Sequence, residues 1–243
     1  VVHRTVKTIG IGESFLAEKL QLWENSLKSV NIKLAYLPSP GVVKLRLSGY
    51  GETKNKVLAS ISNKIKELTT IVGDYIYGCE KEELNQLVGD LLLGSSKTLS
   101  TAESCTGGYI AHLITSVPGS SAYFKGSVIA YNNAVKVAQL RVKQTAINRN
   151  GAVSQQVVEQ MAIGAIKEFE TDYSIATSGI LGPDGGSAEK PVGTIWIAVA
   201  SGSGVISEKI CLGKSRHRNT TITALTSLNM LRKYILSHKK RAL

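Results

Sequence analysis

The spacing of hydrophobic positions divides the first part of the chain into short helices and strands. Apolar residues at helical spacing predict three helices, over 14–28, 54–70 and 80–93. Alternating apolar residues predict two strands, near 32–36 and 43–47, and the Pro-Ser-Pro-Gly segment between them predicts a hairpin. We therefore expect a small α+β module over residues 1–78. The helix at 80–93 can either close this module or open the next one.

From residue 94 onward, strand-like and helix-like segments alternate along the chain. Strands are expected near 98–102, 126–131, 173–178, 193–200 and 204–212. Helices are expected near 106–116, 154–170 and 218–237. The last helix has an apolar stripe of Ala224, Leu228, Leu231 and Ile235. This order predicts a layered α/β domain over 79–243, with helices packed against a sheet.

Length and composition agree with two modest domains and exclude several classes. The 243 residues are 43% hydrophobic and 19% charged, which excludes a disordered or fibrous protein. The longest apolar stretch, at 195–200, is far shorter than the roughly 20 residues of a membrane span, so we expect no membrane partner. The chain begins with Val1, without a signal peptide or an initiator Met, which predicts a fragment of a longer protein.

Cysteine and histidine are too few and too scattered to build a metal centre. Cys79, Cys105 and Cys211 form no pair at metal-ligand spacing, and the four histidines are equally dispersed. An odd, sparse cysteine count indicates a reducing compartment, so we expect a cytoplasmic protein. We expect no metal site and no cofactor.

The net charge of +11 comes mainly from the C-terminal end. Residues 209–243 contain nine Lys or Arg and no Asp or Glu. Such a segment indicates an anionic partner, for example a phosphate ester, nucleic acid or an acidic surface. The helix dipole also favours basic residues at a solvated helix end, and this explains Lys239–Arg241 equally well without an anionic partner.

The segment 98–109 has the composition of a strand, a tight turn and a helix N-terminus. In one interpretation Ser104 or Thr106 caps the helix. In the other, Ser104 is a nucleophile, and the amides around Thr106, Gly107 and Gly108 hold an oxyanion or a phosphate. The segment alone favours the cap.

Further candidate residues follow the next predicted strand. Tyr131, Asn132 and Lys136 lie where open α/β sheets bind ligands, at the carboxyl end of a strand. Since these motifs contain no histidine, a lysine or tyrosine with a lowered pKa is the available base for a serine. Taken alone, however, this segment favours a turn at Asn132 and a solvated surface charge at Lys136.

Two glycine-containing loops complete the candidate site. The long loop 178–193 carries Asp184, Glu189 and Lys190, which can contact a ligand, although Pro-Asp-Gly is also an ordinary turn. Before the helix at 154–170, Ser154 has the position of an N-cap, and an amide near Ala152 can face a ligand.

Together, these segments resemble the C-terminal domain of the CinA (competence/damage-inducible) family, the PncC-type nicotinamide-nucleotide amidases. The resemblance spans residues 98 to about 235 and is carried by five segments: Ala102–Gly108, Tyr131-Asn132 with Lys136, Gly151–Ser154, Met161-Ala162, and Gly182–Gly186 with Glu189–Gly193. Upstream, Arg4–Ser14 and Ala35–Gly41 resemble the linker domain of full-length CinA proteins, which is similar to a KH fold. The family's N-terminal domain is expected to be absent.

The resemblance implies hydrolysis of nicotinamide mononucleotide to nicotinate mononucleotide and ammonia, in pyridine nucleotide salvage, by a homo-oligomer, namely a dimer. Its implied catalytic residues are Ser104, Lys136 and Tyr131, with Lys136 or Tyr131 as the base. Its implied substrate-binding residues are Thr106, Gly107, Gly108, Asn132, Ala152, Gly182, Arg216 and Arg218.

The chain departs from the family in two places. Leu181 replaces the usual alanine, and Gly213-Lys214-Ser215 replaces Gly-Asp-Arg. If the family arginine binds substrate, its role either passes to Arg216 or Arg218 or is lost. A catalytically silent scaffold that binds nucleotides or nucleic acid, linked to competence or DNA damage, is the alternative function.

Overall fold

The computed structural model describes residues 1–241, with side chains up to residue 238. The basic side chains of Lys239–Arg241 lie outside the described part, so their role stays a prediction. The chain divides into two compact units between Glu83 and Leu84, a few residues after the boundary expected at 78 and 79.

The residues that follow the expected boundary belong to the first unit because they bind its first strand. The Thr5 amide donates to the Glu80 carboxylate at 3.1 Å. The Lys7 amine donates to the Glu82 carbonyl at 2.8 Å and forms an ion pair with Glu83 at 2.6 Å.

The first unit is the expected α+β module, with two strands that the sequence pattern missed. Its elements are β1 (Val2–Ile9), α1 (Glu13–Leu27), β2 (Ile32–Ser39), β3 (Val42–Gly49), α2 (Lys54–Val72) and β4 (Ile76–Cys79). They form an antiparallel sheet of order β2-β3-β1-β4, with β2 and β3 as the predicted hairpin. We did not predict β1 or β4, since β1 is rich in polar residues and β4 has only four residues.

The core of this unit lies between the sheet and its two helices. The predicted apolar stripe of α1, namely Leu16, Leu20, Trp23 and Leu27, is buried against β-strand residues such as Leu45 and Leu47. The Trp23 indole N–H donates to the Lys64 carbonyl of α2 at 3.1 Å, which ties the two helices together.

The second unit is the expected layered α/β domain. Its strands are β5 (Leu99–Glu103), β6 (Phe124–Ile129), β7 (Tyr173–Gly179), β8 (Thr194–Ser201) and β9 (Gly204–Cys211). Its helices are α3 (Leu84–Leu93), α4 (Tyr109–Thr115), α5 (Asn133–Leu140), α6 (Gln144–Asn150), α7 (Gln155–Phe169) and α8 (Arg216–Arg241). We did not predict α5 and α6, because helices of eight and seven residues are too short for a clear periodicity. Among the described residues, no helix is long and apolar enough to cross a membrane.

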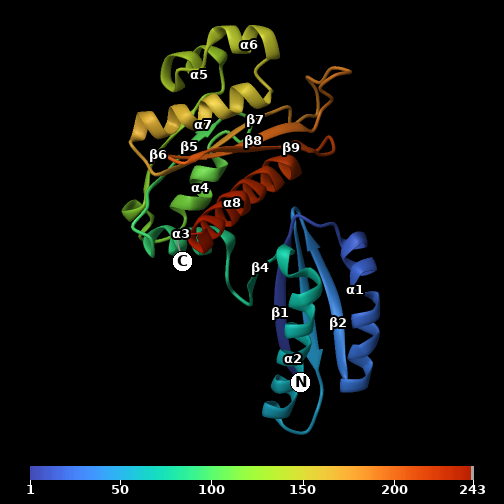
Figure 1. Cartoon of the computed structure of the whole chain (residues 1–243). Helices are drawn as coiled ribbons and strands as arrows, with labels where there is room; N and C mark the ends of the chain where they lie inside the picture. Colours follow the sequence, from blue (N-terminus) through green and yellow to red (C-terminus); the bar gives the residue numbers. More distant parts are fainter. Residues whose placement is uncertain (242–243) are drawn as a thin grey trace. The chain divides into compact units, whose positions relative to one another are not determined.

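The order of the strands places a ligand-binding edge next to Ser104. The sheet has the order β6-β5-β7-β8-β9, with β6, β5 and β7 parallel and the last two strands antiparallel. Figure 1 shows α7 on one face of this sheet and α4 and α8 on the other. The chain therefore leaves β5 through α4 on one face and returns to β7 through α7 on the opposite face. Where neighbouring strands of an open α/β sheet are connected on opposite faces, ligands bind at the carboxyl ends of those strands. Ser104 directly follows the carboxyl end of β5 and so lies at this position.

Candidate active site

Ser104 and Lys136, which are 32 residues apart, meet at the carboxyl edge of the parallel strands. The Lys136 amine lies 3.1 Å from Ser104 Oγ and donates to the Ala130 carbonyl at 2.7 Å. The Lys136 side chain is only 2% exposed, so the interpretation of this residue as a solvated surface charge is wrong. The structure thus gives a hydroxyl and a buried amine within hydrogen-bond distance.

The surroundings of Lys136 favour its neutral form. Burial lowers the pKa of the Lys136 amine, because a charged ammonium loses its hydration there. Within the described part of the chain, Lys136 forms no ion pair that would restore the charged form. A lowered pKa makes the unprotonated amine more accessible, and an unprotonated amine can take the proton of a serine nucleophile.

Asn132 positions Lys136 through the start of α5. Its side-chain oxygen accepts a hydrogen bond from the Ala134 amide at 2.8 Å and so caps this helix. Asn132 is exposed and does not line the cavity beside Ser104. The turn interpretation of Asn132 is therefore confirmed, whereas its expected contact with a substrate has no support from its position.

The turn after Ser104 is organised by a residue that the sequence analysis did not single out. The fully buried Glu103 carboxylate accepts hydrogen bonds from the amides of Gly108, Ile110 and Ala111 at 3.0, 3.1 and 2.8 Å. The N-cap of α4 is Gly108, with no side-chain cap of its own. The expectation that Ser104 or Thr106 caps this helix is wrong, since the acidic side chain before them binds the free amides.

The same turn determines which amides can hold an oxyanion. Gly107 and Gly108 have φ angles of +62° and +97°, a left-handed conformation that glycine adopts without strain. The Gly107 amide donates to the Ser104 carbonyl at 3.2 Å, and the Gly108 amide binds Glu103. Two of the three expected donors, Gly107 and Gly108, are thus occupied. Among the described residues, the amides of Cys105 and Thr106 have no acceptor, so they are the available donors.

A cavity of about 190 Å³ opens beside Ser104. It is lined by Ser104, Cys105, Tyr131, Gly179, Ile180, Leu181 and Arg216. Tyr131 is 65% exposed and forms no hydrogen bond with Ser104 in the described part of the chain. The geometry therefore favours Lys136 over Tyr131 as the base.

Of the two candidate arginines, Arg216 belongs to the cavity. Its Nε donates to the Gly182 carbonyl at 2.6 Å, which holds the guanidinium beside the loop that follows β7. Arg218 is exposed and does not line the cavity. Gly182 thus contributes through its carbonyl, and the altered Gly213-Lys214-Ser215 segment still delivers one arginine to the site.

Cys105 packs as a small hydrophobic residue. It is 9% exposed and contacts the apolar cluster of Leu181, Ile195 and Ile197. Burial raises the pKa of its thiol to about 12, so Cys105 carries no thiolate near neutral pH. This burial confirms the expectation that Cys105 points into the core.

Thr177 is a second residue that the sequence analysis missed. Its hydroxyl lies 2.8 Å from the Thr106 hydroxyl, and its carbonyl accepts from the Ser104 amide at 3.0 Å. Both contacts join β7 to the turn after β5. Thr177 belongs to an ordinary strand sequence, which carries no signal for such a role.

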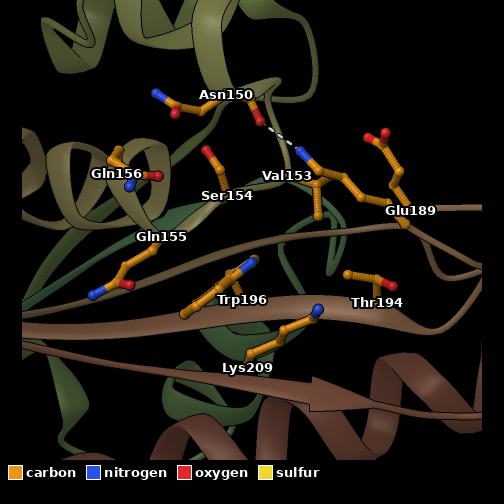
Figure 2. Close-up of a pocket in the computed structure, with 10 residues that line it drawn as sticks. Asn150, Val153, Ser154, Gln155, Gln156, Glu189, Thr194, Trp196 and Lys209 are labelled. Atoms are coloured by element: carbon orange, nitrogen blue, oxygen red, sulfur yellow. Dashed lines mark hydrogen bonds between the residues drawn. The ribbon is translucent and has the colours of Figure 1, made fainter.

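Three of the remaining candidate residues line a second cavity, of about 270 Å³ (Figure 2). It is lined by Glu189, Lys190 and Ser154 among others, but not by Ala152. The Ala152 carbonyl accepts from the Ser178 hydroxyl at 2.8 Å. Ser154 is the N-cap residue of α7, but its hydroxyl donates to the Gly151 carbonyl at 2.9 Å and does not cap the helix. Asp184 is exposed and lines neither cavity.

The sequence matches one family over nearly the whole described chain. The family model described as "CinA C-terminal domain" matches residues 81–235, and that of the "Damage-inducible protein CinA KH domain" matches residues 3–78. The chain belongs to the CinA family. Both matches confirm the resemblance that the Ser104 and Lys136 motifs indicated.

Individual CinA proteins support this assignment. A "CinA-like protein" of Cytophaga hutchinsonii is 46% identical over 97% of this chain and 56% of its own length. A "Putative competence-damage inducible protein" of Halothermothrix orenii is 41% identical over 97% of this chain and 56% of its own length. The chain thus spans a little over half the length of these curated relatives.

Solved structures of the family match the second unit. The crystal structure of competence/damage inducible protein CihA from Agrobacterium tumefaciens is 36% identical, with a TM-score of 0.60, over 62% of this chain and 94% of that chain. A CinA superfamily protein from Escherichia coli is 28% identical, with a TM-score of 0.60, over 63% of this chain and 90% of its own. These matches support the α/β fold of a CinA C-terminal domain.

Proposed function

We propose that this CinA-family chain hydrolyses the carboxamide of nicotinamide mononucleotide to nicotinate mononucleotide and ammonia. The observation that carries the proposal is the 3.1 Å contact between Ser104 Oγ and the buried amine of Lys136. A serine hydroxyl and a lysine whose pKa is lowered by burial supply the nucleophile and the base that amide hydrolysis requires. Membership of the CinA family supports an amidase activity. The resemblance to its C-terminal domain implies that the substrate is a pyridine nucleotide.

The reaction divides into acylation and deacylation. Ser104 Oγ attacks the carboxamide carbon while Lys136 takes the hydroxyl proton. The tetrahedral intermediate collapses as Lys136 returns this proton to the nitrogen, which leaves as ammonia. Water then attacks the acyl-serine, with Lys136 again as the base, and releases the carboxylate and the free Ser104.

Backbone amides and Arg216 supply the remaining interactions. The Cys105 and Thr106 amides follow Ser104 directly and donate to the oxyanion of the tetrahedral intermediate. One such donor is typically worth about 10²–10³ in rate. Arg216 lies in the same cavity and pairs with the substrate phosphate, because a guanidinium binds two phosphate oxygens at once.

The test is ammonia release from nicotinamide mononucleotide by the wild type and three variants. We expect Ser104→Ala to abolish turnover and Lys136→Met to lower kcat by at least about 10²-fold, the usual contribution of a general base. Lys167→Met is the matched control, since Lys167 is an exposed lysine of α7, and it should keep full activity.

Turnover that persists in Ser104→Ala would refute Ser104 as the nucleophile. No turnover by well-folded wild-type protein would refute the amidase and favour the binding-only alternative. A burst of one ammonia per chain, ahead of nicotinate mononucleotide release, would show the acyl-enzyme directly.

One observation favours nucleic-acid binding as a second function, in the first unit. Lys33, Lys44 and Arg46 lie on the face of its sheet opposite the buried Leu45 and Leu47. A basic face attracts phosphates, and such binding weakens steeply with salt. Single-stranded DNA that binds with no salt dependence, or with equal affinity to Arg46→Gln, would refute this function.

A further inference from the structure

One wall of the Ser104 cavity is the loop that follows β7, and its first three carbonyls each accept a hydrogen bond. Ile180 and Leu181, the first two residues of this loop, line the cavity. The Ile180 carbonyl accepts from the Gly193 amide at 2.7 Å. The next two carbonyls, of Leu181 and Gly182, accept from side chains at the start of α8. The position of this wall therefore depends on α8.

Asn219, in the first turn of α8, joins two backbone segments of the site. Its Nδ2 group donates to the Leu181 carbonyl at 2.9 Å and to the Gly213 carbonyl at 2.6 Å. Leu181 belongs to the cavity wall, and Gly213 lies in the segment that leads into α8. Asn219 is 1% exposed, so both hydrogen bonds are shielded from water. One amide group thus holds the cavity wall against the start of α8.

The orientation of Arg216 depends on the same wall. Its Nε donates to the Gly182 carbonyl, which directly follows the carbonyl that Asn219 binds. Arg216 is exposed, and packing alone does not restrict the many rotamers of an exposed arginine. The Nε hydrogen bond therefore directs the guanidinium, and it requires Gly182 to stay within reach. The two terminal nitrogens of Arg216 bind no acceptor among the residues that the structure describes, so they are available to a substrate.

The other polar atom of the Asn219 side chain makes the residue a poor choice for stability alone. Its Oδ1 is buried and has no hydrogen-bond partner within the described part of the chain. A buried polar atom without a partner is unfavourable. Leucine has a similar size and lacks this oxygen, so Asn219→Leu recovers part of the stability that is lost with the two Nδ2 hydrogen bonds. A purely structural role therefore predicts a small effect of this change, whereas a positioning role predicts weaker substrate binding.

We propose that Asn219 is a positioning residue that sets the affinity for the phosphate group of the substrate through Arg216. This inference rests on the proposed amidase function, which assigns Arg216 to the phosphate. Asn219 holds the Leu181 carbonyl, the adjacent Gly182 carbonyl holds Arg216 Nε, and the guanidinium keeps one orientation beside the cavity. The proposed nucleophile and base come from the turn after β5 and from α5, with which Asn219 shares no hydrogen bond in the described chain. Loss of Asn219 should therefore change KM and leave kcat nearly intact.

Steady-state kinetics of ammonia release from nicotinamide mononucleotide test this role. We expect Asn219→Leu to raise KM by about tenfold, as for one weakened hydrogen bond to a charged group, with kcat within about threefold of the wild type. Asn219→Ser keeps one donor and should raise KM less. Asn229→Leu is the matched control, because Asn229 is another buried asparagine of α8 and its side chain binds Arg232 instead of the loop after β7. This control should leave KM unchanged.

A double-mutant comparison shows whether Asn219 acts through Arg216. In an Arg216→Gln background, Asn219→Leu should raise KM by no more than about twofold, because the residue through which it acts is already gone. Calorimetric titration of Ser104→Ala with nicotinamide mononucleotide measures binding without turnover, and the addition of Asn219→Leu should weaken this binding by about tenfold. Urea unfolding first establishes that each variant is folded, and Asn219→Ser takes the place of Asn219→Leu if the latter is not.

The outcomes separate this inference from the proposed function. An equal rise of KM with and without Arg216 would overturn the positioning role, as would a fall of kcat at unchanged KM. Wild-type turnover with the same KM in the folded Asn219 variants would refute this inference alone. A wild-type chain that neither binds nor hydrolyses nicotinamide mononucleotide would refute the proposed function and this inference together.

Discussion

Glu103→Gln is the substitution that most directly tests how the fold holds the catalytic turn. The change replaces one carboxylate oxygen by an amide nitrogen and hardly alters the shape of the side chain. Glu103 is fully buried and accepts three backbone N–H groups, two on Oε2 and one on Oε1. Glutamine keeps only one acceptor oxygen, so its NH₂ group faces at least one backbone N–H.

The expected loss of stability follows from these three hydrogen bonds. Two bonds change from charge-assisted to neutral, and each loses about 1 kcal/mol. The third amide becomes a buried donor without an acceptor, which costs about 1–3 kcal/mol. The second unit should therefore lose about 3–5 kcal/mol of its free energy of unfolding. The turn that carries Ser104 should also lose its fixed geometry. We therefore expect kcat to fall, because Ser104 is held less firmly beside Lys136.

Urea unfolding of the second unit measures this loss. Trp23 lies in the first unit and Trp196 in the second, so a Trp23→Phe background leaves one fluorescent reporter in the relevant unit. Glu168→Gln is the matched control, because Glu168 is exposed and forms no hydrogen bond within the described chain. A loss below about 1 kcal/mol in Glu103→Gln, or an equal loss in the control, would refute the role assigned to this carboxylate.

Three further predictions concern the neighbours of Ser104. Cys105→Ala should keep kcat within a few-fold in the ammonia assay, because a buried thiol with its pKa raised to about 12 takes no part in the reaction; loss of turnover would contradict this. Asn132→Ala should destabilise the second unit by about 1 kcal/mol in urea and lower kcat, because α5 loses its cap; an unchanged urea midpoint would count against it. Burial lowers the pKa of Lys136 in the folded chain, so the unfolded chain binds more protons between this pKa and the ordinary value of 10.5. The free energy of unfolding should therefore rise with pH in that window, more steeply in the wild type than in Lys136→Met, and parallel curves would refute it.

The long elements of this fold are predictable from sequence because they bury a wide apolar stripe. The stripe of α8, from Ala224 to Ile235, is buried as its helical spacing predicts. Short elements lack such a pattern. The eight residues of α5 place Lys136 in the interior, while the sequence alone indicates a solvated charge.

Part of the candidate site follows from local sequence and part from long-range contacts. The motif around Ser104 identifies the turn, but a motif cannot show that the Glu103 side chain folds forward to bind α4. Thr177 meets Thr106 only because β7 pairs with β5, and the two residues are 71 positions apart. The choice of Arg216 over Arg218 likewise depends on the direction in which α8 begins.

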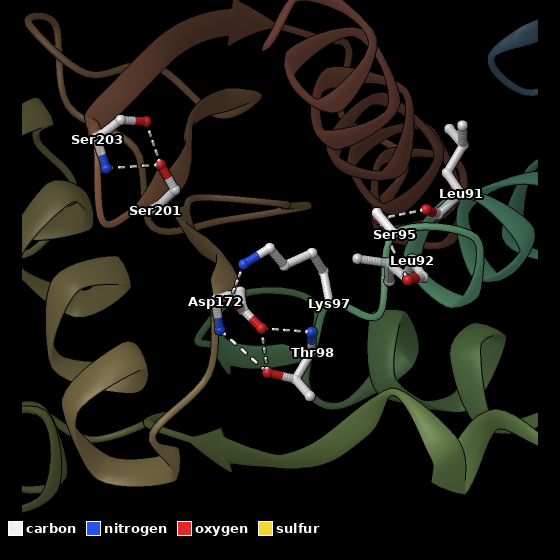
Figure 3. A network of polar contacts seen from close by, with 8 residues as sticks. All are labelled: Leu91, Leu92, Ser95, Lys97, Thr98, Asp172, Ser201 and Ser203. Carbon is white, nitrogen blue, oxygen red and sulfur yellow. Dashed lines mark hydrogen bonds and ion pairs between the residues drawn. The ribbon is translucent and has the colours of Figure 1, made fainter. Parts of the chain in front are cut away.

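The contact between Ser104 and Lys136 owes its geometry to strands that are joined at both ends. At the start of β5 and β7, the Asp172 carboxylate accepts from the Thr98 amide and hydroxyl, both at 2.9 Å, and pairs with Lys97 at 2.7 Å (Figure 3). Burial alone would raise the pKa of Asp172, but these contacts outweigh it and lower the pKa. At the other end, Thr177 binds the turn that carries Ser104. Ser104 therefore sits on a rigid frame, as the proposed amide hydrolysis would require, because a nucleophile and its base must be held within a fraction of an ångström.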